Sequence, residues 1–218
     1  MIDIKNLSKS FGARTVWSDI SFTVNGGEML ALIGPSGSGK STLLNCLGLL
    51  ERPDKGEICY EGKDITRFGR RDIRRYRRDT LGYLFQHYAL IETATVQENL
   101  EVVTKLRRSS QRPANTSLAE VLDRVGLTGR EEEKISHLSG GEQQRVALAR
   151  LMIQQPTVVL ADEPTGALDD ANSTMVIDIL EGMSKSGCSV VIATHDDSVR
   201  SRCDAVFAVH DSSLVGSL

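Results

Sequence analysis

The eight residues GPSGSGKS, Gly34 to Ser41, constrain this chain more than any other stretch. They fit the pattern GxxxxGK[ST] at every fixed position, between the apolar run EMLALIG at 28–34 and the helix-spaced leucines of STLLNCLGLL at 41–50. A strand, a glycine-rich loop and a helix in this order form the setting in which backbone N–H groups cradle phosphates. The helix N-terminus adds a positive partial charge. The stretch therefore predicts a nucleotide-binding loop.

Within this loop, two side chains have specific expected roles. Lys40 is expected to reach the β- and γ-phosphates of a nucleotide, and Ser41 to hold Mg²⁺. The alternative is an ordinary glycine-rich turn between a strand and a helix, which the complete pattern in its strand–loop–helix setting disfavours. The residues predicted to contact the nucleotide here are Gly34, Ser36, Gly37, Ser38, Gly39, Lys40, Ser41 and Thr42.

Two apolar runs further along the chain end in residues with chemistry. VVLADE at 158–163 ends in two carboxylates, of which Asp162 suits the Mg²⁺ shell while Glu163 suits the activation of a water. SVVIATH at 189–195 ends in His195. The alternative is a solvated strand end, but parallel strands bring both ends to the carboxyl edge of the sheet, where ligands bind. We therefore expect all three side chains near the phosphate loop.

The order of predicted elements indicates an α/β fold. The first thirty residues read as strands, with a hairpin signal at Asn25-Gly26-Gly27 and a second hairpin around 57–65. Residues 88–155 read as helical, with a polar loop at Ser109–Ser117, and strands and helices alternate again from 156 onward. We predict a single domain, 1–218, with a mainly parallel sheet. Residues 1–87 and 156–218 form its core and an antiparallel β subdomain, and 88–155 form an inserted α-helical subdomain.

Composition excludes several classes of protein. Lys plus Arg is 26 against 29 for Asp plus Glu, a net charge of −3 that gives no overall electrostatic reason to bind nucleic acid. The four cysteines lack CxxC spacing and read as reduced thiols. We find neither a signal-peptide pattern at the N-terminus nor an apolar run long enough to span a membrane. A soluble chain is expected, whose membrane role, if any, comes through a partner.

With these motifs in order, the chain resembles the nucleotide-binding subunits of ABC transporters over essentially its whole length. GPSGSGKS resembles the Walker A motif, VVLADE the Walker B motif, and LSGGEQQR at 138–145 the signature motif peculiar to this family. The single residues that match other family motifs are Phe11 (the aromatic residue that stacks on adenine), Gln86 (Q-loop), Ala167, Leu168 and Asp169 (D-loop), and His195 (switch histidine).

The resemblance implies an ATPase that uses ATP and Mg²⁺. It implies catalytic roles for Gln86, Glu163 and His195, and Mg²⁺ contacts for Ser41, Gln86 and Asp162. It also implies a head-to-tail dimer in which each ATP lies between one chain's phosphate loop and the other chain's signature motif. The residues this adds to the nucleotide contacts are Phe11, Ser139, Gly140, Gly141 and Asp169.

The family pattern also implies a membrane permease as partner, docked on the segment 86–99 at the cytoplasmic face of the cell's inner membrane. TVQENL at 95–100 and LADEPTGALDD at 160–170 resemble the ATPases of lipoprotein-release, macrolide-efflux, antimicrobial-peptide-resistance and haem-export systems, which export or extract their substrates. Leu90-Ile91-Glu92 replaces the usual LLP of that group and resembles a bacteriocin-export branch. The chain ends soon after DAVFAV at 204–209, so we expect no regulatory C-terminal domain.

Other interpretations remain at this stage. The basic run Arg67–Asp79 reads as a solvated helix face, as a contact for anionic lipid or the permease, or as a nucleic-acid contact with Tyr76 as its one aromatic residue. An ABC-type ATPase of translation or DNA repair is the alternative function. Such members resemble two fused domains or carry coiled coils or zinc cysteines, and this chain has one set of motifs. A catalytically dead module would lack Lys40, Glu163 or His195, and all are present.

Overall fold

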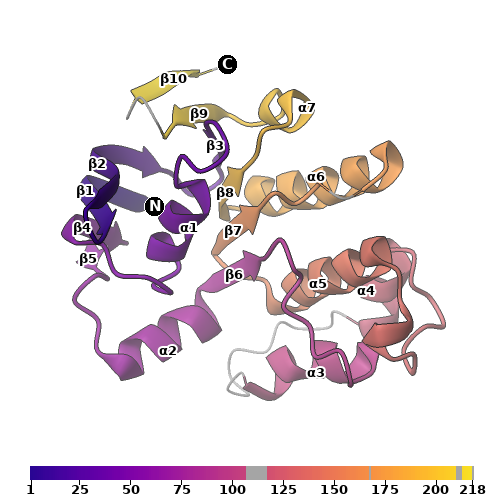
Figure 1. Ribbon diagram of the computed structural model, residues 1–218. Helices are drawn as coiled ribbons and strands as arrows, with labels where there is room; N and C mark the ends of the chain where they lie inside the picture. Colours follow the sequence, from indigo (N-terminus) through magenta and orange to yellow (C-terminus); the bar gives the residue numbers. More distant parts are fainter. Residues whose placement is uncertain (107–116, 167, 210–212, 218) are drawn as a thin grey trace.

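The computed structural model describes residues 1–106, 117–166, 168–209 and 213–217, which form two sheets (Figure 1). The antiparallel sheet has the order β2-β1-β4-β5 and the larger sheet the order β10-β9-β3-β8-β7-β6, in which only β10 is antiparallel to its neighbour. The predicted α/β architecture with an N-terminal antiparallel sheet is confirmed. The strands are β1 (Ile2–Phe11), β2 (Arg14–Val24), β3 (Met29–Ile33), β4 (Lys55–Tyr60), β5 (Lys63–Asp64), β6 (Leu81–Leu84), β7 (Val158–Asp162), β8 (Ser189–Ala193), β9 (Ala205–Ala208) and β10 (Ser213–Ser217).

The helices fall where apolar residues recur at helical spacing. The region 88–155 that reads as helical contains α4, which begins at a capping box of Ser117 and Glu120, and α6 is one of the helices that alternate with strands from 156 onward. Most of the predicted polar loop Ser109–Ser117 lies outside the described residues. The α-helices are α1 (Lys40–Leu47), α2 (Arg70–Asp79), α3 (Val96–Leu106), α4 (Leu118–Arg124), α5 (Gly140–Gln154), α6 (Asp170–Lys185) and α7 (Asp197–Arg200). None of them combines the length and the apolar character that a bilayer crossing requires.

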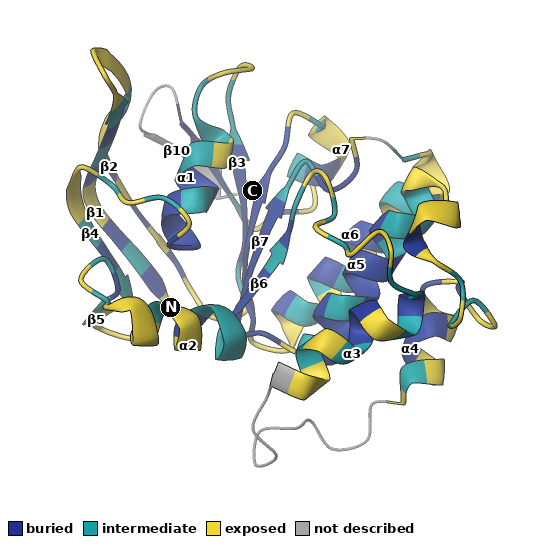
Figure 2. Ribbon diagram, turned by 60° about the horizontal axis from the view of Figure 1, so that its bottom comes forward, coloured by how far each residue is buried: buried dark blue, intermediate teal, exposed yellow. Residues whose placement is uncertain are grey.

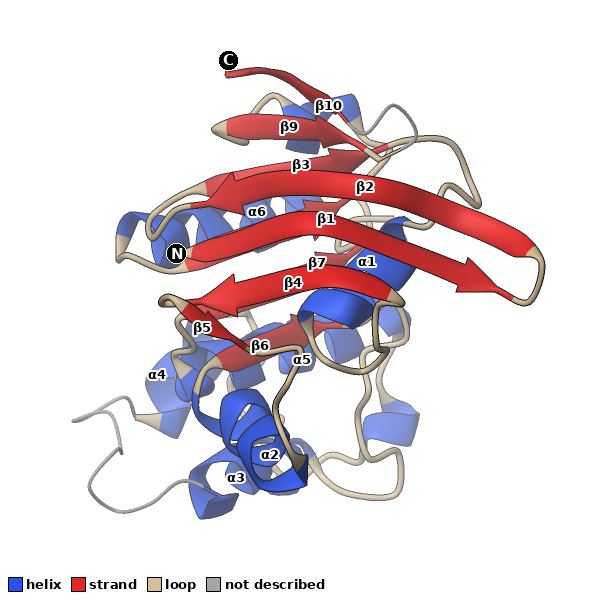
Figure 3. Ribbon diagram, turned by 90° about the vertical axis from the view of Figure 1, so that its left-hand side faces the viewer, coloured by secondary structure: helices blue, strands red, loops and turns tan. Residues whose placement is uncertain are grey.

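Strand β3 is buried on both faces, which explains its unbroken apolar sequence. Leu30 and Leu32 pack with α1 and the antiparallel sheet, whereas Met29 and Ala31 pack with the helices α5 and α6. The central strands are therefore dark blue between the two layers in Figure 2. Helix α1 packs between the antiparallel sheet and the larger sheet (Figure 1), so the loop that precedes it is supported from two sides. Figure 3 shows the antiparallel sheet in front of the larger one.

The predicted hairpin at Asn25-Gly26-Gly27 is wrong. Strand β2 before this turn pairs with β1, while β3 after it pairs with β8 and β9 in the other sheet. The turn is held by Gly27, whose N–H donates to the Cys188 carbonyl at 3.1 Å, and by Glu28, whose carboxylate accepts from the Asn25 backbone at 2.8 Å. The continuous apolar character of the next strand requires burial on both faces, which overrides the local turn signal. The second predicted hairpin is confirmed, as β4 and β5.

Candidate active site

The phosphate loop is shaped by contact with the antiparallel sheet. Gly39 has φ +92° and is the N-cap of α1. A Cβ added there would lie 2.4 Å from Val16 Cγ1 and 2.8 Å from Trp17 Cδ1, so only glycine fits. The buried Trp17 donates its indole N–H to the Gly39 carbonyl at 3.3 Å. Strand β2 therefore supports the loop directly from behind.

Lys40 and Ser41 begin helix α1 and take different directions. The Lys40 ammonium folds over the loop and donates to the Gly34 carbonyl at 2.7 Å. The Ser41 hydroxyl donates to Asp162 Oδ1 at 3.1 Å. Burial raises the pKa of Asp162, and the charge of Glu163 raises it further, while the Ser41 hydrogen bond and the Lys40 charge oppose this shift. A hydroxyl and a carboxylate thus meet beside the phosphate loop.

Glu163 and His195 face each other at the ends of two adjacent parallel strands. His195 Nδ1 lies 2.9 Å from Glu163 Oε2, and the Glu163 N–H donates to the Ala193 carbonyl at 2.9 Å. Glu163 has φ +47°, a left-handed conformation that is uncommon outside glycine. Its side chain is 19% exposed and that of His195 is 73% exposed. The two carboxylates at the end of β7 therefore have separate partners, one in α1 and one after β8.

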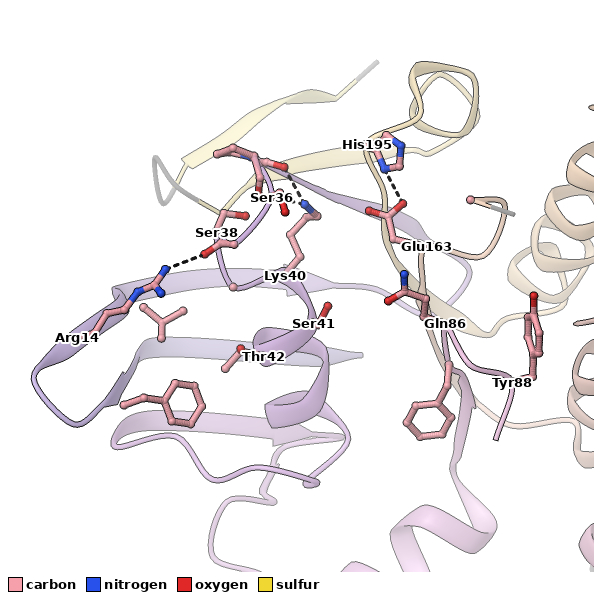
Figure 4. A pocket seen from close by; sticks show the side chains of 18 of the residues that line it. Arg14, Ser36, Ser38, Lys40, Ser41, Thr42, Gln86, Tyr88, Glu163 and His195 are labelled. Atoms are coloured by element: carbon pink, nitrogen blue, oxygen red, sulfur yellow. Dashed lines mark hydrogen bonds and ion pairs between the residues drawn. The ribbon is translucent and has the colours of Figure 1, made fainter. Parts of the chain in front are cut away.

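These groups surround a cavity of about 920 Å³. Figure 4 shows Ser36, Ser38 and Lys40 on one wall, with Gln86, Glu163 and His195 across from them. The Ser38 hydroxyl oxygen is buried without a hydrogen-bond partner among the described residues, so it is available to a ligand in the cavity. The predicted residues that line the cavity are Phe11, Gly34, Ser36, Gly37, Ser38, Gly39, Lys40, Ser41, Thr42, Gln86, Glu163 and His195.

The N-terminal part of the signature motif, 139–141, does not line this cavity. Among the described residues that line it, none is Ser139, Gly140, Gly141 or Asp169, although the buried Gln144 of the same motif does line it. Ser139 instead caps α5 and donates its hydroxyl to Glu142 Oε2 at 2.8 Å. Hydrogen bonds from Ser139 hold the pKa of Glu142 below its ordinary value.

The D-loop residue Asp169 has a similar capping position. It is the N-cap of α6, where its carboxylate accepts hydrogen bonds from the backbone and side chain of Asn172. These bonds hold the pKa of Asp169 below its ordinary value. Ala167 of the same motif lies outside the described residues. Asp169 and Ser139 thus both end a loop at a helix N-terminus that does not face the chain's own cavity.

The segment after Gln86 is hydrogen-bonded to α5, the helix that begins within the signature motif. Tyr88 and Ala89 have φ of +57° and +49°, and their carbonyls accept hydrogen bonds from the Arg150 guanidinium at 3.0 and 2.7 Å. Burial lowers the pKa of Arg150. At the other end of the helix, a Cβ added at Gly140 would lie 3.5 Å from the Tyr88 hydroxyl. Movement of this segment would therefore be transmitted to α5.

Several lining residues were missed by the sequence analysis, notably Arg14, Val16, Phe85 and Tyr88. Arg14 pairs with Phe11 across the turn between β1 and β2, and its guanidinium is 3.5 Å from the Gly37 carbonyl. The signal was available in part, because Gly12 marks the turn and strand period places Arg14 and Val16 on one face. That this hairpin folds across the phosphate loop is a tertiary feature.

Comparison with known proteins identifies this arrangement. The ABC transporter family model matches residues 17–166. The chain belongs to the ABC transporter family. It is an ATP-binding cassette of that family, and the resemblance of its motifs to those of ABC ATPases is confirmed.

Two curated relatives show how this ABC cassette compares in length. It is 39% identical over 203 residues to the macrolide export ATP-binding/permease protein MacB of Escherichia coli, covering 91% of this chain and 31% of that protein. It is 37% identical over 200 residues to the lipoprotein-releasing system ATP-binding protein LolD of Bacteroides thetaiotaomicron, covering 91% of this chain and 92% of that protein. The cassette therefore spans about a third of the length of MacB and nearly all of LolD.

Solved structures agree with this assignment. A dimeric ATP-binding cassette in a post-hydrolysis state, bound to ADP and phosphate, superposes with a TM-score of 0.87 at 30% identity. The match covers 100% of this chain and 98% of that one. A dimeric bacterial ABC transporter cassette gives a TM-score of 0.88 at 31% identity over the same shares of each chain.

Proposed function

We propose that this cassette hydrolyses ATP between two head-to-tail copies of itself and thereby drives a separate membrane permease. The observation that carries the proposal is that the phosphate loop and residues 139–141 of the signature motif in one chain do not face the same cavity. Glu163 and His195 face the phosphate loop across one cavity, while Ser139 and Gly140 of the signature motif are exposed away from it. A complete phosphate site would then require a signature motif from a second copy.

Within one site, the residues divide the work of phosphoryl transfer. The Phe11 ring is exposed at the rim and stacks on adenine, while the loop N–H groups and Lys40 hold the phosphates. Glu163 takes the proton of a water whose oxygen attacks the γ-phosphorus. The bond from phosphorus to the bridging β–γ oxygen breaks, and ADP and phosphate leave. His195 holds the Glu163 carboxylate in place and faces the γ-phosphate.

The donor set beside the loop fits Mg²⁺. This ion prefers hard oxygen ligands and is held by one or two carboxylates together with substrate phosphates. The Ser41 hydroxyl and the Asp162 carboxylate are 3.1 Å apart, and the exposed Gln86 amide lines the same cavity. These three residues would hold the ion, which when bound neutralises charge on the β- and γ-phosphates.

A complementation experiment tests the shared site. Lys40→Ala disrupts only the phosphate loop, and Ser139→Arg disrupts only the signature motif. Either homodimer is expected to be nearly inactive, because each of its two sites contains one defect. Mixing the two creates heterodimers in which both defects fall in one site and the other site is whole. Random pairing makes half the dimers mixed, so about a quarter of the wild-type sites return.

The readouts are ATPase activity and ATP-dependent pairing of the mixed chains. Pairing is included because two sites that must act together would lower the recovered rate. If each chain built a complete site alone, mixing would restore nothing by either measure, and the composite site would be rejected.

The permease contact is proposed at segment 86–99, on the cytoplasmic face of the cell's inner membrane. The fastening of Tyr88 and Ala89 to α5 supports it, since motion there would reach the signature motif. Glu92 is exposed and suits a charge-reversal test, with Glu92→Lys expected to weaken permease assembly while nucleotide affinity stays unchanged. Glu98 does not suit it, because its carboxylate caps α3 at the Thr95 N–H, 2.8 Å away. Permease crosslinks that landed only on the N-terminal strands would contradict the assignment.

The transported substrate is proposed only by class. The chain's relatives are named for macrolide export, pyoverdine export and lipoprotein release. Each name describes movement out of the cell or out of a membrane. We infer an exporter or membrane extractor for a peptide, lipid, drug or haem-like molecule, with selectivity set by the permease. Co-purification of the permease and assay of its cargo would test this inference.

A further inference from the structure

Helix α2 concentrates positive charge on a chain that is acidic overall. Its ten residues hold six arginines against two aspartates, a net charge of +4, whereas the whole chain carries −3. The nucleotide cavity uses none of them. Such segregation of charge on one element raises the question of what the arginines face.

One side of α2 is fixed to the core. Tyr76 is buried and its hydroxyl donates to the Leu47 carbonyl at 3.4 Å. The Arg77 guanidinium donates to the Gly48 carbonyl at 3.2 Å and also contacts the Leu49 carbonyl. Arg77 therefore satisfies carbonyls at the end of α1, where a cation is favoured by the helix dipole. This side of the helix has a structural role.

The other side of α2 presents arginines to solvent. Arg70, Arg71, Arg74 and Arg75 are all exposed, and at about 100° per residue they span an arc of roughly 140°. We call these four residues the arginine face. Among the described residues, no ion pair forms at Arg70 or Arg71, and Arg75 reaches Asp72 only at 4.0 Å. Like charges four residues apart disfavour a helix, so folding alone does not account for this face.

We propose that the arginine face binds anionic phospholipid headgroups of the membrane that holds the permease. The guanidinium group matches phosphate with two parallel hydrogen bonds, and basic surfaces are attracted to the anionic inner leaflet. Figures 1 and 3 place α2 along the same lower edge as α3, which continues directly from the proposed permease contact at 86–99. This location rests on the proposed function.

The chemistry favours lipid over nucleic acid. Single strands are bound through exposed aromatic rings as well as charge. The one aromatic residue within α2, Tyr76, is buried against the core, so the arginine face offers charge without a stacking platform. A membrane surface requires only charge presented on an outward face.

The experiment measures binding of the full chain to vesicles by co-sedimentation. Vesicles of phosphatidylcholine with about 30% phosphatidylglycerol are compared with phosphatidylcholine alone. Arg70→Gln/Arg71→Gln is expected to weaken binding to the anionic vesicles roughly 25-fold, or about fivefold per arginine. The matched control is Arg52→Gln/Lys55→Gln, which removes the same charge from two exposed positions at or just before the start of β4 and should leave binding within about twofold of wild type.

Four results would overturn the proposal. These are no binding to anionic vesicles at low salt, equal weakening by the control pair, displacement by soluble glycerol phosphate, and tighter binding to a DNA duplex at matched phosphate concentration. ATPase activity without vesicles is measured in parallel and should be unchanged in both variants. Absence of ATPase activity in the wild-type chain would count against the proposed function. The vesicle result would still decide whether the arginine face binds lipid.

Discussion

The phosphate loop and the signature motif have the same local design and different surroundings. Each is a glycine-rich turn at the N-terminus of a helix, with Gly39 before α1 and Ser139 before α5. Val16 and Trp17 press against the first, whereas the second is exposed and capped by Glu142 of its own helix. Local sequence is therefore enough to form an anion-binding turn at a helix N-terminus. A nucleotide site also requires neighbouring segments that pack around that turn.

The first prediction, with the strongest change, distinguishes ATP hydrolysis from ATP binding at the phosphate loop. Glu163→Gln should slow ATP hydrolysis by about 10²–10⁴-fold while ATP binding persists, because the shape remains and the proton acceptor is lost. Trapped ATP should also favour the dimer. Glu61→Gln is the matched control, since Glu61 has φ +48° but lies outside the cavity. Near-normal ATP turnover by Glu163→Gln with the permease present would show that Glu163 is not the base that takes the proton of the attacking water.

The second prediction tests the support of the phosphate loop. Gly39→Ala should destabilise the chain by about 2–4 kcal/mol, from left-handed strain plus contact with Val16 and Trp17, and should weaken ATP binding. Gly62→Ala is the control, because Gly62 has φ +77° with open space around it. It should lose only about 1–2 kcal/mol, with unchanged ATP affinity. Urea unfolding and nucleotide titration measure both, and equal losses would show that strand β2 does not shape the loop.

The third prediction turns to the signature motif. Ser139→Ala should cost about 1 kcal/mol of stability through the lost cap, and should lower ATPase roughly 10–100-fold if its hydroxyl makes the proposed bond to the phosphate of ATP held by the partner. Ser117→Ala removes a comparable capping serine from α4 and should show the stability loss alone. Steady-state ATPase and thermal unfolding distinguish the two. If Ser139→Ala kept full activity, the motif would serve only to cap its helix.

The smallest effect concerns the pH dependence of stability. Burial raises the pKa of Asp162, so the folded chain binds this proton more tightly than the unfolded chain does. The ionised carboxyl therefore opposes folding above its folded pKa, and this opposition disappears as the pH falls toward the ordinary value for Asp. Asp162→Asn should stabilise the nucleotide-free chain by roughly 1 kcal/mol or less at pH 7, and by less at pH 4.

Two comparisons check this prediction. Asp197→Asn, whose side chain is 93% exposed, should show no such difference between the two pH values. Mg²⁺-dependent ATPase should fall in Asp162→Asn, because the neutral amide is a poorer ligand for the ion. Equal stability changes at both pH values, measured by urea unfolding, would contradict the assignment of the pH effect to Asp162.

The parts of the site that follow from short sequence patterns were predictable. The meeting of Glu163 and His195 follows from two apolar strands that each end in a polar residue at one edge of a parallel sheet. Arg14 was predictable only in part and Tyr88 was not, because their positions depend on how the β1–β2 hairpin and the segment after Gln86 fold onto the loop. The prediction of a hairpin at 25–27 was wrong for a related reason. A turn signal does not determine which sheet the next strand joins.

The contact between Trp17 and Gly39 has a practical consequence. Trp17 is the only tryptophan in the 218 residues, it is 4% exposed, and its indole N–H is bonded to the loop that surrounds the phosphates. Indole emission depends on the polarity and hydrogen bonding around the ring. The chain therefore contains one built-in optical probe, located at the phosphate loop, so that nucleotide occupancy can be followed in solution by intrinsic fluorescence without attaching a label.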